Sequence, residues 1–154
     1  GGNGIGKACC LMLAQFGASV VVADLKTEDA QAVVDEITSA GGRALAVSCN
    51  VLEDDDLTNL VDRTLEKFGA LHILVNNVGG GGACRESPDQ ITVQQCAHVF
   101  QLNVFSMWRL SQLCAPHMKK AGYGSIINMS SMSSINNSPA ISAYASQKAK
   151  ESLA

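Results

Sequence analysis

Four short apolar runs that contain β-branched residues recur along the chain, and their spacing limits its fold more than any other feature. They lie at residues 18–24 (ASVVVAD), 43–51 (RALAVSCNV), 72–78 (HILVNNV) and 125–129 (SIINM). Such runs are apolar almost throughout rather than at alternate positions, which is typical of strands covered on both faces of a parallel sheet. The sequence therefore predicts four buried parallel strands.

Helical patterns fill the connections between these runs. One helical face is formed by Ala30, Val33, Val34 and Ile37, and a second by Leu57, Leu60, Val61, Thr64, Leu65 and Phe68. Thr27 is placed to cap the first of these helices, while Gly41 and Gly69 suit the positions after the helix ends. Strands that alternate with amphipathic helices predict an α/β fold with a doubly wound parallel sheet of Rossmann type.

We expect one domain over residues 1–154, because no linker, tandem repeat or low-complexity segment divides the chain. A long helix is expected at about residues 95–120, which Pro116 would either kink or end. Asp54, Asp55 and Asp56 are expected to cap and charge the first turn of their helix, with no further function.

Charge and hydropathy exclude several classes of partner. The net charge is −3 without any run of lysine and arginine, so the chain lacks the footprint of a nucleic-acid or anionic-membrane binder. No apolar run approaches the roughly 20 residues that a membrane span needs. We therefore expect small molecules, or further copies of the same protein, as partners.

The cysteine pattern favours reduced thiols. None of the six cysteines forms a C-x-x-C pair, and no histidine lies at metal-ligand spacing from them. This pattern predicts no metal site and indicates a reducing, cytoplasmic setting. The cysteines are Cys9, Cys10, Cys49, Cys84, Cys96 and Cys114.

The stretch GGNGIGK at residues 1–7 leads directly into a helical pattern. Gly2, Gly4 and Gly6 remove side chains where a backbone would approach a pyrophosphate, which a helix N-terminus attracts. Asp24 ends the next strand, where its carboxylate can accept hydrogen bonds from the adenosine ribose and would repel a 2′-phosphate. These residues favour NAD over NADP. A plain glycine-rich turn and a helix-capping Asp24 are the alternatives.

Motifs along the whole chain resemble those of the short-chain dehydrogenase/reductase family. They appear in the family's order, as GGNGIG at 1–6, Asp24, NNVG at 76–79, LNV at 102–104, SIINMSS at 125–131 and YASQK at 144–148. The resemblance implies that the fold is truncated at both ends here, without its first strand, its last strands and the substrate loop. It also implies a homotetramer of the complete protein.

The resemblance assigns roles to individual residues. Tyr144 would be the catalytic acid and base. Ser131, or Ser130 in its place, would bind the substrate oxygen. Asn103 would hold a water that links Lys148 to solvent. Two positions depart from the family pattern, because Val78 replaces an alanine and Asn50 replaces the aspartate that contacts adenine. The implied cofactor-binding residues are Gly2, Asn3, Gly4, Ile5, Gly6, Asp24, Asn50, Val51, Asn77, Val78, Gly79, Tyr144 and Lys148.

The spacing of Tyr144 and Lys148 suits proton transfer. Residues four apart share a helix face, so the lysine ammonium can lower the phenol pKa from its usual value near ~10. Oxidation of a secondary alcohol needs such a base, while a nicotinamide accepts the hydride. The alternative is that Tyr144 and Lys148 are a solvated surface pair without a catalytic role.

Within the family, the segments ILVNNVGGGG and LNVFS make the chain most similar to bacterial NAD-dependent 7α-hydroxysteroid dehydrogenases. This resemblance implies hydride transfer between NAD and a hydroxysteroid. The alternatives are a 3-oxoacyl carrier-protein reductase, against which Asp24 argues, and a non-catalytic nucleotide-binding module.

Overall fold

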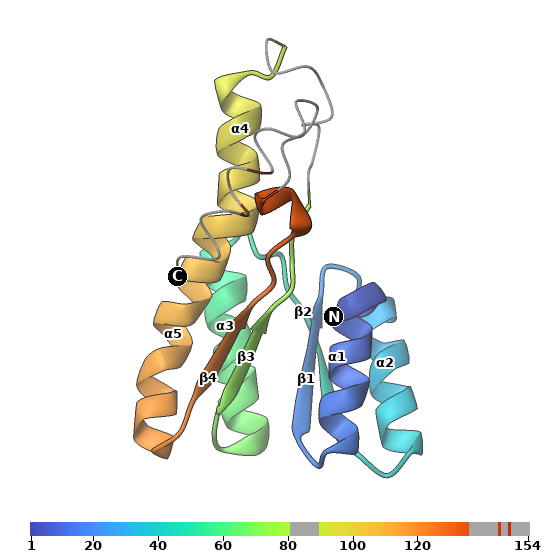
Figure 1. The fold of residues 1–154 in the computed structure, drawn as a ribbon. Coiled ribbons are helices and arrows are strands. Elements are labelled where there is room, and N and C mark those ends of the chain that lie inside the picture. Colours follow the sequence, from blue (N-terminus) through green and yellow to red (C-terminus); the bar gives the residue numbers. More distant parts are fainter. Residues whose placement is uncertain (81–89, 136–144, 146–147, 149–154) are drawn as a thin grey trace. The chain divides into compact units, whose positions relative to one another are not determined.

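The computed structural model describes residues 1–80, 90–135, 145 and 148 (Figure 1). Two units are described separately: Gly1–Ile73 with Leu113–Ser125, and Leu74–Gln112 with Ile126–Ala154. Both units combine helices with a pair of strands, so the α/β class expected from the sequence is confirmed. The expectation of a single domain stays a prediction.

A parallel pair of strands forms the centre of the first unit. Strand β1 (Ser19–Asp24) pairs with β2 (Arg43–Ser48) in a register that runs from Ser19 opposite Arg43 to Asp24 opposite Ser48. Val22 is fully buried in β1, as its apolar surroundings in the sequence predict. The first two predicted strands are therefore confirmed, and β2 ends three residues earlier than expected.

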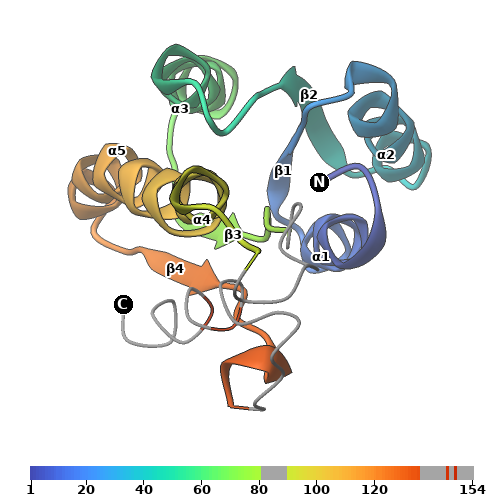
Figure 2. The same cartoon turned by 90° about the horizontal axis from the view of Figure 1, so that it is seen from above.

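Helices cover both faces of this pair. Figure 2 shows α1 (Gly4–Gln15) and α2 (Thr27–Ser39) on one side of the strands and α3 (Asp54–Phe68) on the other. The main core lies between β1 and α2, with further contacts from α1. Its buried members are Val20, Val22, Ala30, Val33, Val34 and Ile37, so the first predicted helical face is confirmed.

The helix ends in this unit agree with the sequence in part. Gly41 and Gly69 have φ values of 84° and 77°, and this left-handed region favours glycine. Thr27, however, does not cap α2, because the extended N-cap residue is Lys26 and Thr27 already lies in the first turn. Asp54, Asp55 and Asp56 charge the first turn of α3, but Glu53 is its N-cap and no side chain makes a capping hydrogen bond.

The other two predicted strands are also present. Strand β3 (Ile73–Asn76) neighbours β4 (Ser125–Asn128), and hydrogen bonds from Ser125 N to His72 O and from Met129 N to Asn76 O advance by four residues on each strand, which is a parallel pattern. Ile126 and Ile127 are still 39% and 43% exposed. The expected burial fails for both β3 and β4, because in the described part of the chain these two strands pair only with each other.

One helical run extends from residue 93 to residue 121. It consists of α4 (Val93–Phe100), a π-helical turn η1 (Gln101–Phe105) and α5 (Ser106–Ala121). Pro116 lies inside α5 and does not end it, so the expectation that it would end the helix is wrong. A short 3-10 turn, η2 (Met132–Ser134), follows β4. In the described part of the chain, no helix has the length and hydropathy that a bilayer crossing requires.

Candidate active site

The glycine-rich segment places bare backbone at the start of α1. Asn3 is the N-cap residue, its side chain makes no capping hydrogen bond, and the first turn contains no acidic residue. The first backbone hydrogen bond of the helix runs from Lys7 N to Asn3 O, so the N–H groups of Gly4, Ile5 and Gly6 precede the helical ladder. Such an N-terminus suits an anion, because its N–H groups point outward and carry partial positive charge.

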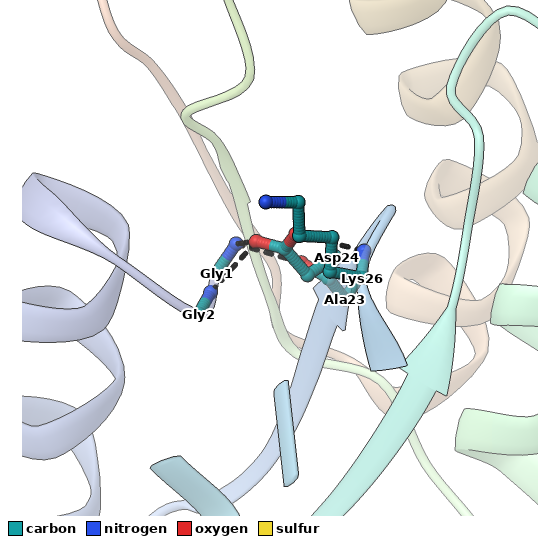
Figure 3. Close-up of polar contacts among 5 residues, drawn as sticks. All are labelled: Gly1, Gly2, Ala23, Asp24 and Lys26. Atoms are coloured by element: carbon teal, nitrogen blue, oxygen red, sulfur yellow. Dashed lines mark hydrogen bonds and ion pairs between the residues drawn. The ribbon is translucent and has the colours of Figure 1, made fainter. Parts of the chain in front are cut away.

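Asp24 faces this segment from the end of β1 (Figure 3). Its Oδ2 accepts hydrogen bonds from Gly1 N at 3.0 Å and Gly2 N at 2.9 Å, and its Oδ1 accepts one from Lys26 N at 3.1 Å. A carboxylate has about four acceptor positions, so roughly one remains for a ligand hydroxyl. Asp24 therefore ties the glycine-rich segment to the strand and keeps one acceptor position available.

The same contacts lower the pKa of the Asp24 carboxyl group. Partial burial of the carboxyl opposes its ionisation, but the hydrogen bonds from the N–H groups of Gly2 and Lys26 favour the carboxylate and outweigh burial. These hydrogen bonds lower the pKa of Asp24 below its ordinary value of 3.8. The group is thus negatively charged throughout the neutral range, as recognition of a ribose requires.

Gly2 is required for packing rather than for a turn. A Cβ atom at Gly2 would lie 2.6 Å from Asp29 Cβ and 2.7 Å from Asp29 C, a separation that real Cβ atoms do not show. Gly4 has a φ of 54° and open space around it, and Gly6 is buried in α1. The three glycines were expected to serve the approach of a pyrophosphate, and the structure adds that Gly2 lets the segment lie directly on α2.

Asn50 and Val51 lie in the turn that follows β2. Asn50 Oδ1 accepts a hydrogen bond from Leu52 N at 3.2 Å, and Asn50 N donates one to Asp56 Oδ2 at 2.8 Å. The oxygen expected to accept a bond from adenine is therefore already used once within its own turn. One further lone pair of Oδ1 is left for such a contact.

In the second unit, Asn103 is paired with the backbone of Gly80. Its Oδ1 accepts a hydrogen bond from Gly80 N at 2.9 Å, and its Nδ2 donates one to Gly80 O at 3.0 Å. Asn103 is 1% exposed and lies in the π-helical turn η1. Because this pairing engages both ends of its carboxamide, Asn103 holds the loop after β3 in addition to any role with a water.

Lys148 lies against the same loop. Its Nζ donates a hydrogen bond to Met129 O at 2.8 Å, and the residue is 4% exposed. A Cβ atom at Gly79 would lie 2.9 Å from Asn103 Oδ1 and 3.1 Å from Lys148 Nζ. The absence of a side chain at Gly79 therefore lets the amide and the ammonium converge on one place.

The remaining candidates of this unit are spread along its loops. Asn77 follows β3 and donates from its backbone to Val75 O, and the side chain of Val78 is 43% exposed. Tyr144 lies outside the described residues, so its position relative to Lys148 stays a prediction.

The two serines after β4 differ in their partners. Ser130 Oγ donates to the backbone oxygen of Lys148 at 2.8 Å, whereas Ser131 Oγ accepts a hydrogen bond from Ser133 N at 3.2 Å and so caps η2. Ser130, which the sequence makes the fallback, is thus joined to the lysine segment. Ser131 is joined to its own turn.

The sequence analysis missed one group of polar side chains at the ends of β3 and β4. Asn76 Nδ2 donates to Asn128 Oδ1 at 2.9 Å and lies 3.5 Å from Ser111 Oγ. The signal available in the sequence is an asparagine at the carboxyl end of each of two neighbouring strands. A cluster of three or more metal-ligating side chains is absent from the described part of the chain.

Comparison with known proteins shows which family this chain belongs to. The family model described as short chain dehydrogenase matches residues 1–151. The 7α-hydroxysteroid dehydrogenase of Escherichia coli strain K12 is 42% identical over 151 residues, which are 98% of this chain and 58% of that protein. The chain therefore spans less than two thirds of this relative.

Two solved structures have the same fold. A 7α-hydroxysteroid dehydrogenase complexed with NADH and 7-oxo glycochenodeoxycholic acid has a TM-score of 0.93 at 42% identity, over 99% of this chain and 58% of that one. A 3-ketoacyl-ACP reductase from Sinorhizobium meliloti 1021 has a TM-score of 0.94 at 30% identity, over 99% and 60% of the two chains. The Rossmann-type fold is thereby confirmed, and the chain belongs to the short-chain dehydrogenase family.

Proposed function

We propose that this protein is an oxidoreductase that transfers a hydride between NAD and a secondary alcohol or ketone, with a 7α-hydroxy bile acid as its substrate. The observation that carries the proposal is the buried ammonium of Lys148, held by the Met129 carbonyl beside Gly79. Burying a lysine charge is unfavourable unless partners compensate for it, and such groups are concentrated at functional sites. A solvated surface pair, the alternative interpretation of Tyr144 and Lys148, does not fit a lysine that is 4% exposed.

The first unit supplies a fitting place for the adenosine half of NAD. Its pyrophosphate would be held by the N–H groups at the start of α1, where neither a side-chain cap nor an acidic residue competes. The ribose would be held by the remaining acceptor position of Asp24, whose charge disfavours the 2′-phosphate of NADP. Asn50 would offer its second lone pair to the adenine amino group.

NAD, when bound, supplies the acceptor for the hydride, and the chain supplies the proton chemistry. Tyr144 would take the hydroxyl proton of the alcohol, because the ammonium of Lys148 stabilises its phenolate. Ser131 would bind the substrate oxygen through its hydroxyl group. Asn103 would keep the loop at Gly79 and Gly80 in place, and a water would link Lys148 to solvent.

The substrate class is supported by two relatives of 42% identity. One is named a 7α-hydroxysteroid dehydrogenase, and the solved one is complexed with a 7-oxo bile acid. The second candidate, a 3-oxoacyl carrier-protein reductase, is supported by the TM-score of 0.94 to a protein of that activity. Asp24 favours the first candidate over a reductase that uses NADP, because its charge disfavours the 2′-phosphate.

Assembly and location follow from surface and thiol chemistry. Phe105 and Trp108 are 53% and 58% exposed on the run of η1 and α5, which supports contact with a second copy within a homotetramer. The five described cysteines are free thiols, and Cys49 and Cys114 are buried, which supports a cytoplasmic setting. Cys84 lies outside the described residues.

The decisive experiment follows the absorbance of reduced nicotinamide with the full-length protein. NAD and a 7α-hydroxy bile acid are expected to give a steady rise, whereas the matching 7β-hydroxy epimer is the control and should react slowly. NADP should be the poorer acceptor. Faster oxidation of reduced NADP by a 3-oxoacyl carrier protein than of reduced NAD by a 7-oxo bile acid would favour the second candidate.

A further inference from the structure

The Met129 carbonyl accepts a hydrogen bond from the Lys148 ammonium, so its position helps to decide where the ammonium lies. The hydrogen bond measures 2.8 Å and is formed by a residue that is 4% exposed. A buried ammonium that loses such an acceptor must find another one or move towards water. Whatever fixes Met129 therefore helps to hold Lys148 in place.

Met129 lies one residue beyond the end of β4 and is bound at both of its backbone polar groups. Its N–H donates to Asn76 O at 3.0 Å, while its carbonyl accepts from Lys148 Nζ. The hydrogen bond from Met129 N to Asn76 O is therefore the last contact of the β3–β4 pairing that could hold this carbonyl in place. Any loosening of the contact between Asn76 and β4 would be transmitted directly to the lysine.

A side-chain bridge stands at this end of the sheet. Asn128 Oδ1 accepts the hydrogen bond from Asn76 Nδ2 at 2.9 Å, one residue before Met129. A parallel pair of strands needs only backbone groups for its ladder. The hydrogen bond between the two amide side chains is thus additional to the backbone pairing. In the sequence, Asn128 directly precedes Met129, whose carbonyl accepts the hydrogen bond from Lys148.

The same asparagine also precedes the loop that holds Asn103. Gly79 and Gly80 follow Asn76 by three and four residues, and Gly80 forms both hydrogen bonds with the Asn103 carboxamide. The bridge between Asn76 and Asn128 therefore connects the starts of two loops. One leads to the Asn103 pairing and the other to the acceptor of Lys148.

We propose that Asn128 is a positioning residue for Lys148: by accepting the hydrogen bond from Asn76, it fixes the end of β4 so that the Met129 carbonyl receives the ammonium. The inference deepens the proposed function, since it rests on Lys148 as the group that activates the base. A bridge that only stabilises the strand pair is the competing explanation.

Lysine labelling in the full-length protein tests this inference without any assay of activity. Reductive methylation with formaldehyde, read by mass spectrometry, should modify Lys148 slowly and the exposed Lys119 and Lys120 quickly. Asn128→Leu keeps the size of the side chain but removes the acceptor. It should raise the Lys148 rate about tenfold, because one buried hydrogen bond shifts a local opening equilibrium by roughly that factor.

Three further variants separate positioning from general stability. Asn128→Asp keeps an acceptor oxygen and should retain the slow rate, and Asn128→Ser, too short to reach Asn76, replaces Asn128→Leu should the latter not fold. Val33→Ala removes core volume from a residue that is 1% exposed in α2 and gives the effect of lost stability alone. The inference is overturned when Asn128→Leu or Asn128→Ser labels Lys148 no faster than Val33→Ala does, or when Asn128→Asp labels it as fast as Asn128→Leu.

The pH dependence of hydride transfer is the second readout. It should move to higher pH in Asn128→Leu by about half a unit, because a displaced ammonium lowers the phenol pKa less, and it should stay in place in Asn128→Asp. Wild-type protein that protects Lys148 but transfers no hydride with any alcohol would refute the proposed function and leave the inference standing. An alkaline shift of equal size in Val33→Ala would refute the inference.

Discussion

The carboxamide of Asn103 and the peptide groups of Gly80 form a two-point pair, with N–O distances of 2.9 Å and 3.0 Å. The pair joins the π-helical turn η1 to the loop after β3. Gly79, the preceding residue, lies beside both Asn103 Oδ1 and Lys148 Nζ. A small change at this one glycine is therefore expected to disturb two functional groups at once.

Gly79→Ala should lower kcat at least tenfold while the protein remains folded. Its methyl group would lie 2.9 Å from Asn103 Oδ1 and 3.1 Å from Lys148 Nζ, so at least one of them must move. Steady-state kinetics and thermal unfolding would be measured together. Gly17→Ala is the matched control, because that glycine has open space but a φ of 88°, so alanine there costs stability, on the order of 1 kcal/mol, without touching either group. Equal kcat values in the two variants would contradict the prediction.

Replacement of the base and of its neighbour should have different effects. Tyr144→Phe should lower kcat by roughly a thousandfold, the usual contribution of a general base, while NADH binding measured by fluorescence changes little. Lys148→Met should lower kcat and also move its pH dependence to higher pH, because the phenol then titrates nearer to its ordinary value of ~10. Retention of most activity in Tyr144→Phe would exclude the proposed mechanism.

Asp24→Ser should relax the preference for NAD. The serine removes the negative charge that opposes a 2′-phosphate, so kcat/KM with NADP should rise relative to that with NAD by roughly tenfold or more. Because Asp24 also accepts hydrogen bonds from Gly2 and Lys26, Asp24→Asn serves as the control that keeps an acceptor without the charge. A preference unchanged in both variants would show that another group discriminates between the two dinucleotides.

Acid should weaken the fold partly through Asp24. The N–H groups of Gly2 and Lys26 hold its folded-state pKa below the ordinary 3.8, so its contribution to stability is complete above pH ~4 and is lost as the pH falls through the folded-state pKa. After allowance for solvent screening, the contribution is about 1 kcal/mol. Urea unfolding at pH 7 and pH 2.5 should show a smaller difference for Asp24→Asn than for the wild type. Identical differences would mean that the carboxyl group has the same pKa in the folded and unfolded states.

The buried thiols should resist alkylation. Burial raises the pKa of Cys114 to about 11, and burial together with the charge of Asp56 raises that of Cys49 to about 11 as well. Little thiolate is then present at pH 8, so iodoacetamide should label both slowly in the native protein and rapidly in urea. Peptide mass spectrometry measures the two rates. Rapid native labelling of Cys49 or Cys114 would contradict this account.

The strands and helices could be predicted because their signals are local. Short apolar runs marked all four strands, and the spacing of Val33 and Ile37 marked the buried face of α2. Gly41 and Gly69 marked helix ends because few other residues adopt a positive φ. Thr27 misled the interpretation, since a threonine can cap a helix or begin one, and here Lys26 has the extended conformation.

The candidate site could be predicted in its residues but not in its connections. The sequence indicated Asp24, Asn103 and Lys148, yet no local pattern showed that Gly80 is the partner of Asn103. The bridge from Asn76 to Asn128 joins residues that are 52 apart, and its hydrogen bond exists only because β3 and β4 are neighbours. Such contacts depend on tertiary packing, which the periodicity of a single segment does not reveal.

The π-helical turn at Gln101–Phe105 has a consequence for how this helix could evolve. Such a turn holds one residue more than regular winding would, and π-helical turns are frequent at functional sites. A one-residue deletion there would give a more regular and sturdier helix, but would rotate Asn103 away from its glycine. A sequence selected for helix stability alone would therefore lose the turn, together with the pairing of Asn103 with Gly80.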